Sequence, residues 1–341
     1  MASYEIALML RELLSKSSPG RLLLLANTKR YRSPQVASDA IAEAVRLRSI
    51  DPSSAQVCAD AAVQIARHFG GDLLSRALAE SGNILRIRDH FRRARQTLAE
   101  ALSYAAERPT FFRVWSYRAS LEEAVRAFEC AASCLRAARG YATKPIEIGR
   151  LEAQRGVMAL YQGRPQEAVR ILRQARQLVK EDDRLFLVVL LNHANALAEA
   201  GWSDHARAVM EEAIPLRHLA GEMDQLKARW IDGRISATAG QNYAACVALD
   251  EVRGRYLKGG FHYESALVSL ELMLCLTRAG RFAEAEELGR SSLSVLEALG
   301  IGPGAIEARL LGEAVTSLAE AKVVAALLSL RAWAPPDAEA A

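Results

Sequence analysis

Six alanines recur along this chain at a nearly constant spacing. They are separated by 37 to 40 residues, and a glycine stands five residues before four of them. A period of roughly 20 to 50 residues is the signature of a solenoid, because each repeated unit has an apolar face that only a stacked neighbour can bury. The six positions are Ala94, Ala131, Ala168, Ala206, Ala245 and Ala285.

The unit around Ala168 indicates what is repeated. Pro165 suits the first turn of a helix, and Ala168 and Leu172 follow at the spacing of one helix face. Twelve residues before Ala168, Gly156 lies within another helical pattern, where glycine costs about 1 kcal/mol relative to alanine. We therefore predict a helical hairpin over 146–180 whose helices approach too closely at Gly156 for a Cβ atom. Further strong copies are expected at 74–105, 184–218, 223–257 and 262–298.

Three segments, 81–101, 155–175 and 279–288, resemble tetratricopeptide repeats in their small residues, turn glycine and alanine. The resemblance covers roughly residues 36 to 300, and the chain is also similar to the repeat regions of bacterial regulatory proteins. It implies an all-α fold, a right-handed α-solenoid of about six to seven hairpins. The spacing of 37 to 40 residues exceeds the family's usual value of about 34, which implies longer second helices or longer links.

The rest of the chain divides around this array. We expect N-terminal capping helices over 1–33, the repeat array over 34–300, C-terminal capping helices over 301–333 and a disordered tail over 334–341. Terminal units of a solenoid must cover an exposed face, which is the role expected of both caps. No segment alternates apolar and polar residues convincingly at a period of two, so essentially no strand is predicted.

Composition and cysteine usage indicate the cellular setting. Hydrophobic residues make up 51% of the 341 positions, which is enough for a continuous core. Five cysteines, an odd number in helical pattern, indicate reduced thiols. The N-terminus lacks the basic and apolar regions of a signal peptide, and no apolar stretch is long enough to span a bilayer. We therefore expect a cytoplasmic protein with no membrane partner.

The motifs of common enzymes are missing from the sequence. It contains no HExxH zinc motif, no GxSxG nucleophile motif, no phosphate-binding GxxxxGK[ST] loop and no GxGxxG after a strand. Cys130 and Cys134 share a helix face and could supply two metal ligands, but such a pair usually reflects core packing. We predict no catalytic residue, no metal site and no cofactor.

Binding to a protein or peptide is the function that the architecture favours. The first helix of each hairpin would line the concave side of the solenoid, where asparagine, lysine and arginine can hold a peptide's backbone or carboxylate. The tetratricopeptide resemblance implies the same kind of site, because some family members bind a carboxylate terminus with these residue types. An adaptor or regulatory sensor is therefore expected, with candidate groove residues Asn83, Arg86, Asn192, Asn195, Lys227, Trp230, Arg234 and Arg278.

Charge is unevenly distributed and leaves alternatives open. Residues 81–180 carry a net charge of +10, whereas 181–341 carry −8. The basic segment could contact nucleic acid as part of a regulator, or it could be an ordinary solvated surface. Association of the basic segment with the acidic segment of a second copy would give a homo-oligomer, and a scaffold subunit of an assembly is a further alternative. Five arginines lie close together at the start of the basic segment: Arg86, Arg88, Arg92, Arg93 and Arg95.

Overall fold

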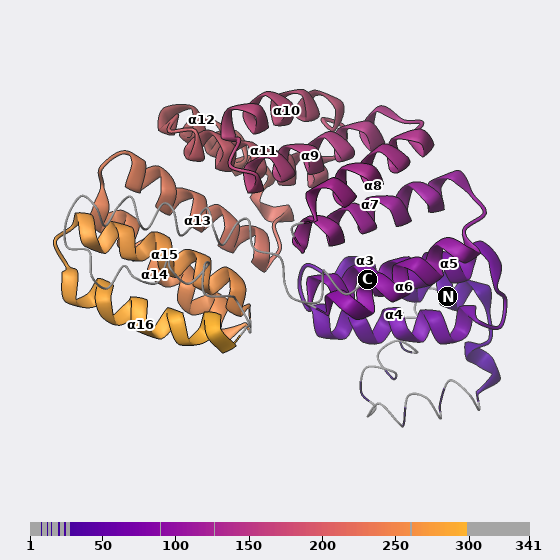
Figure 1. Cartoon of the computed structure of the whole chain (residues 1–341). Coiled ribbons are helices and arrows are strands. Elements are labelled where there is room, and N and C mark those ends of the chain that lie inside the picture. Colours follow the sequence, from indigo (N-terminus) through magenta and orange to yellow (C-terminus); the bar gives the residue numbers. More distant parts are fainter. Residues whose placement is uncertain are drawn as a thin grey trace. The chain divides into compact units, whose positions relative to one another are not determined.

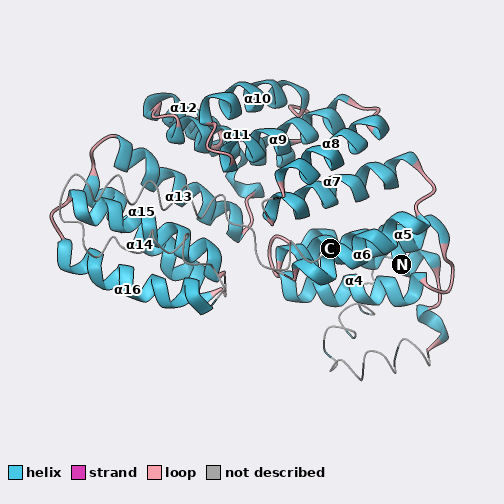
Figure 2. Cartoon of the chain, viewed as in Figure 1, coloured by secondary structure: helices cyan, strands magenta, loops and turns pink. Residues whose placement is uncertain are grey.

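A computed structural model of the chain describes residues 28–88, 90–125, 127–259 and 261–298, together with the single positions 8, 12, 15, 20 and 24. The chain divides into two compact units, with the boundary between Lys144 and Pro145. Throughout the described ranges the secondary structure is helical, and no strand occurs in them (Figure 2). None of the described helices combines the length and the apolarity needed to cross a membrane.

Unit 1 contains three helical hairpins after a short 3-10 helix. In each hairpin the two helices pack closely against each other, and the first helices of neighbouring hairpins also contact one another (Figure 1). The elements are η1 (Lys29–Tyr31), α3 (Pro34–Leu47), α4 (Pro52–Ala66), α5 (Gly71–Ile87), α6 (Phe91–Tyr104), α7 (Arg108–Ala124) and α8 (Phe128–Tyr141).

Unit 2 contains four hairpins built in the same way. Figure 1 shows α10 and α12 along one side of α9 and α11. The elements are α9 (Pro145–Tyr161), α10 (Pro165–Leu178), α11 (Asp183–Glu199), α12 (Ser203–Glu212), η2 (Ile214–Leu219), α13 (Glu222–Thr238), α14 (Asn242–Lys258), α15 (His262–Arg278) and α16 (Phe282–Ala298).

The small residues of the repeat lie where the two helices of a hairpin meet. A Cβ atom on Gly156 would lie 2.5 Å from Cγ of Leu172, and one on Gly233 would lie 3.0 Å from Cδ2 of Leu249. The repeated alanines are buried beside these contacts; Ala168 is fully buried. The predicted close approach of the helices is therefore present. The turn glycines end the first helices with a positive φ, between 71° and 81°, at Gly163, Gly201, Gly240 and Gly280.

One hairpin differs from its neighbours. In the copy predicted over 184–218, the second helix α12 has only 10 residues and is followed by the six-residue 3-10 helix η2. Pro215 lies just past the end of α12. Proline has no backbone N–H and its ring clashes with the preceding turn, so an α-helix does not continue through it. The chain then reaches Leu219 in the tighter helix.

The predicted array is an all-α solenoid of seven hairpins within the described ranges, in agreement with the six to seven expected. The domain boundaries at 33, 300 and 333 stay predictions, as does the right-handed superhelix. The expected C-terminal caps over 301–333 and the tail over 334–341 lie outside the described residues. Of the N-terminal cap over 1–33, only η1 and its flanking residues are described continuously.

A buried histidine on α11 should make unit 2 sensitive to acid. His193 is 4% exposed, and burial together with Arg176 and Arg173 lowers its pKa to about 4. A histidine in the unfolded chain titrates near pH 6.5. Between about pH 6.5 and 4 the unfolded chain therefore binds a proton that the folded chain does not bind, and the folded state loses stability as the pH falls through this range. Urea unfolding should show a loss of about 2 kcal/mol between about pH 7 and pH 5 from this group.

The variant His193→Gln isolates this effect. Glutamine can still accept the hydrogen bond that Arg176 Nη1 makes with His193 Nδ1 at 3.2 Å, but it does not titrate. The pH dependence of the variant should therefore be weaker than that of the wild type by about 2 kcal/mol over the same range. Identical pH profiles for the two proteins would contradict the assignment.

Candidate functional site

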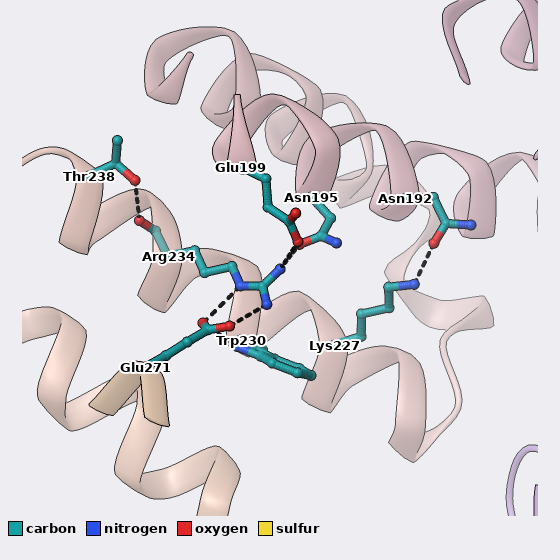
Figure 3. A network of polar contacts seen from close by, with 8 residues as sticks. All are labelled: Asn192, Asn195, Glu199, Lys227, Trp230, Arg234, Thr238 and Glu271. Atoms are coloured by element: carbon teal, nitrogen blue, oxygen red, sulfur yellow. Dashed lines mark hydrogen bonds and ion pairs between the residues drawn. The ribbon is translucent and has the colours of Figure 1, made fainter. Parts of the chain in front are cut away.

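Three first helices of unit 2 converge on the side chain of Arg234, which extends from α13 (Figure 3). Its Nε donates to Oε2 of Glu271 on α15 at 2.8 Å, and its Nη2 donates to the other oxygen of the same carboxylate. Its Nη1 donates to Glu199 of α11 at 2.7 Å and also to Oδ1 of Asn195. The guanidinium thus binds one carboxylate through two parallel bonds and a second through one, an arrangement that is both strong and directional.

All three charged side chains of this cluster are largely buried. The side chains of Arg234, Glu199 and Glu271 are 13%, 12% and 11% exposed. Burial opposes the charge of Arg234, but Glu271 and Glu199 outweigh it and raise the pKa of the guanidinium above its ordinary value. The cluster holds one cation between two carboxylates, so its own charge is −1. We call these three residues together with Asn195 and Trp230 the Arg234 cluster.

Trp230 completes the cluster through three contacts. Its Nε1 donates to Oε2 of Glu271 at 2.7 Å, and the guanidinium carbon of Arg234 lies 4.5 Å from its ring centroid. Its ring also meets the ring of Tyr256 edge to face, with centroids 6.1 Å apart. The indole remains only half-buried. One turn beyond Arg234, Thr238 Oγ1 donates to the Arg234 carbonyl oxygen at 2.8 Å.

Two asparagines of α11 are oriented by cations from α13. Lys227 Nζ donates to Oδ1 of Asn192, just as Arg234 donates to Oδ1 of Asn195 (Figure 3). Lysine and arginine are donors only, so each asparagine must present its oxygen to the cation and its amide nitrogen elsewhere. Neither Nδ2 group has a partner in the described part of the chain, and neither is sealed away from solvent. Asn195 is half-buried and Asn192 is 5% exposed, so each amide is an unpaired donor at or just beneath the surface.

The predicted groove residues are brought together only in part. Asn195, Trp230 and Arg234 share one polar network, and Lys227 and Asn192 form a separate pair between the same two helices, α11 and α13. In unit 1, Asn83 and Arg86 form a separate pair, in which Arg86 Nη2 donates to Oδ1 of Asn83 at 3.0 Å. Arg278 is exposed in the last turn of α15.

Sequence reasoning missed the two glutamates that bind Arg234. It placed Arg234 among residues that hold a peptide's backbone or carboxylate, and the structure gives this guanidinium two carboxylates of the chain itself. One signal was present: Glu271 lies 14 residues before a repeated alanine, where the preceding copy has the buried Ile231. A charged residue at a core position indicates a buried partner.

The basic segment 81–180 extends from α5 to the end of α10 and so belongs to both compact units. Arg95 is half-buried and donates to Glu122 at 2.9 Å. Arg88, Arg92 and Arg93 are exposed. Nothing in these contacts distinguishes a nucleic-acid surface from a solvated one, and the nucleic-acid alternative stays a prediction.

The cysteines do not form a site. Cys134 is buried and Cys130 is exposed, so the two do not share one environment. All five cysteines of the chain are free thiols. Within the described ranges, no group of three or more His, Cys, Asp or Glu side chains is arranged to hold a metal ion.

Comparisons with known proteins identify the fold. No protein-family model and no curated protein matches the sequence. Among solved structures, the chain is similar to a Rap protein complexed with Competence and Sporulation Factor, with a TM-score of 0.65 and 13% identity over 88% of each chain. It is also similar to a Signal Transduction ATPase with Numerous Domains (STAND) protein with a tetratricopeptide repeat sensor, from Pyrococcus horikoshii, with a TM-score of 0.56 and 14% identity.

The second likeness covers 95% of this chain but only 52% of the STAND protein. At 13% and 14% identity, both likenesses concern the fold alone. They confirm the predicted resemblance: the chain has the all-α solenoid fold of tetratricopeptide-repeat proteins, similar to that of regulatory proteins.

Proposed function

We propose that the chain is a non-enzymatic regulator or adaptor that binds a peptide segment of a partner along the first helices α11, α13 and α15. The observation that carries the proposal is the pair of amide donors on Asn192 and Asn195, each oriented by a cation that holds its oxygen. Backbone carbonyl groups of an extended peptide need such donors wherever binding removes them from water. Fixed donors lose little entropy on binding, which favours affinity.

The chemistry of this surface favours backbone recognition over capture of a carboxylate. The bonds of Arg234 to Glu271 and Glu199 engage each of its three nitrogens, and the cluster has a net charge of −1. An acidic terminus would meet two buried carboxylates here. The half-buried ring of Trp230 supplies an apolar surface beside the donors, and buried tryptophan is a frequent anchor at protein interfaces.

The similar fold of a Rap protein, solved in complex with Competence and Sporulation Factor, supports a binding role for this architecture. The free thiols of all five cysteines support the expected cytoplasmic setting. A scaffold subunit, a homo-oligomer and a nucleic-acid regulator are the alternatives, but none of the contacts among the described residues favours one of them over peptide binding.

Peptide display on the nuclease-treated full chain tests the proposal. Enriched sequences are synthesised, and their affinity is measured by fluorescence anisotropy. The double variant Asn192→Asp, Asn195→Asp keeps an oxygen for Lys227 and Arg234 but replaces each amide donor by an acceptor. Asn195→Asp adds a carboxylate beside Glu199 and Glu271 and should lower the stability, so circular dichroism must show that the variant is folded at the assay temperature. The folded variant should bind the selected peptides about tenfold more weakly or worse, because it loses two hydrogen bonds and repels peptide carbonyls.

The matched control is Gln174→Glu, Gln241→Glu, which adds the same charge at two exposed positions on or beside the second helices α10 and α14. It should bind the peptides as the wild type does. The proposal is wrong if selection gives no saturable ligand, or if the two double variants bind equally well.

A further inference from the structure

Beside the short helix α12, unit 2 has a pocket that the proposed peptide binding does not use. α12 has 10 residues, whereas the corresponding helices α10 and α14 have 14 and 17. Where a longer helix would pack against α13, the chain instead runs through the 3-10 helix η2. A pocket of about 280 Å³ lies between α11, α12, η2 and α13.

One part of the pocket wall is apolar. Leu187 and Leu191 of α11 and Met210 of α12 are buried side chains that contribute to it, together with the half-buried Ala228 of α13. Leucine and methionine side chains form a wall that accepts a branched or linear aliphatic group, and methionine adapts readily to its shape. The pocket is small, which limits it to a ligand of a few heavy atoms or one side chain.

Four charged residues line the remaining wall, and two of them are already engaged. Asp224 binds Arg184 at 2.7 Å and accepts from the backbone N–H of Gly221 at 3.0 Å. Arg229 binds Glu251 at 2.8 Å. These two residues have their charges compensated within the chain and offer little to a ligand.

The other two are Asp232 of α13 and Arg217 of η2. Neither side chain makes a hydrogen bond or ion pair with any residue in the described ranges. Burial raises the pKa of Asp232, and the more distant charges of Arg217 and Arg229 offset this only in part. The carboxylate is half-buried and has no hydrogen-bond donor in the described ranges. One half-buried anion and one exposed cation, neither with a hydrogen-bond or ion-pair partner in the described ranges, therefore border the same apolar pocket.

We propose that this pocket binds a free α-amino acid with an aliphatic side chain. The ammonium group would donate to Asp232, the carboxylate would accept from Arg217, and the side chain would lie against Leu187, Leu191 and Met210. A purely apolar ligand would bury the Asp232 carboxylate further without giving it a hydrogen-bond partner. A simple anion would be repelled by the charge of Asp232. A ligand with an ammonium group, a carboxylate and an apolar side chain complements Asp232, Arg217 and the apolar wall together.

The proposal is independent of peptide binding at the Arg234 cluster, because it concerns other residues and another ligand. Isothermal titration calorimetry of the full chain with L-leucine, L-isoleucine, L-valine and L-methionine tests it. At least one should bind saturably at a single site. For the best ligand, the amide lacking the carboxylate and the acid lacking the ammonium group should each bind about tenfold more weakly or worse.

Two variants locate the site. Asp232→Asn removes the anion without changing side-chain size, and Ala228→Leu fills the pocket; each should weaken binding by about tenfold or more while circular dichroism remains unchanged. The control Asp250→Asn removes an exposed carboxylate of α14 and should bind as the wild type does. The proposal fails if none of the four amino acids binds, if the amide binds as tightly as the amino acid, or if Asp232→Asn has no effect.

Discussion

Replacing Arg234 by leucine should lower the free energy of unfolding of unit 2 by roughly 3 to 5 kcal/mol. The substitution leaves the carboxylates of Glu199 and Glu271 buried, close to each other and without their cation. Desolvated like charges repel, and the remaining donors, Trp230 Nε1 among them, do not compensate two anions. Urea unfolding followed by circular dichroism measures the loss.

Two further measurements separate this mechanism from simple loss of packing. Adding Glu199→Gln and Glu271→Gln to the variant should restore most of the stability, because neutral amides need no cation. In the single variant, protonation of the two buried glutamates relieves their repulsion, so the stability that the variant has lost relative to the wild type should shrink as the pH falls. A loss below about 1 kcal/mol, as for an exposed ion pair, would contradict the buried character of the cluster.

The sequence contained enough local information to predict the hairpins. Gly163, Pro165 and Ala168 determine a turn, a helix start and a packing face within six positions, and these signals act on neighbouring residues only. The interruption of α12 was also encoded locally, by Pro215, but the helix pattern around Met210 masked it. The pocket beside η2 depends on how α13 packs against that interruption, which no local pattern specifies.

The polar network was harder to predict because its partners come from different hairpins. Arg234 and Glu271 are 37 positions apart. The sequence of α13 alone therefore indicates a cation without a partner. The repeat register nevertheless indicates where such partners are needed. The position 14 residues before each repeated alanine is polar in five of six copies: Glu80, Tyr117, Gln154, Asn192 and Glu271, with Ile231 as the exception.

This register position lies inside the array, where Glu80, Asn192 and Glu271 are each less than 10% exposed. A buried polar side chain there gains stability from a partner on a neighbouring hairpin, since an unpaired one costs stability. Asn192 pairs with Lys227, and Glu271 pairs with Arg234. We call these polar residues, 14 positions before the repeated alanines, the ladder. Through these contacts the ladder links neighbouring first helices, and in unit 2 it also orients the donors proposed to bind a peptide.

In unit 1 the same position predicts a second large effect, on replacing Glu80 by leucine. The carboxylate of Glu80 is fully buried and accepts from Arg48 Nη1 at 2.8 Å and from the Tyr117 hydroxyl at 2.9 Å. Arg48 also donates to the Tyr117 oxygen at 2.8 Å, so α5, α7 and the end of α3 meet in one triangle. Without Glu80, the largely buried Arg48 has no anion, and the loss should be about 3 to 4 kcal/mol.

Hydrogen exchange should locate this loss in unit 1, with faster exchange in α3, α5 and α7 and little change in unit 2. The control Glu43→Leu removes the partner of Arg46 from an exposed pair on α3 and should cost less than about 1 kcal/mol. Adding Arg48→Met to Glu80→Leu should recover stability, because the uncompensated cation is then removed as well. If the two single variants lose equal stability, or if the double variant recovers none, Glu80 acts through packing alone and the ladder is not held by charge.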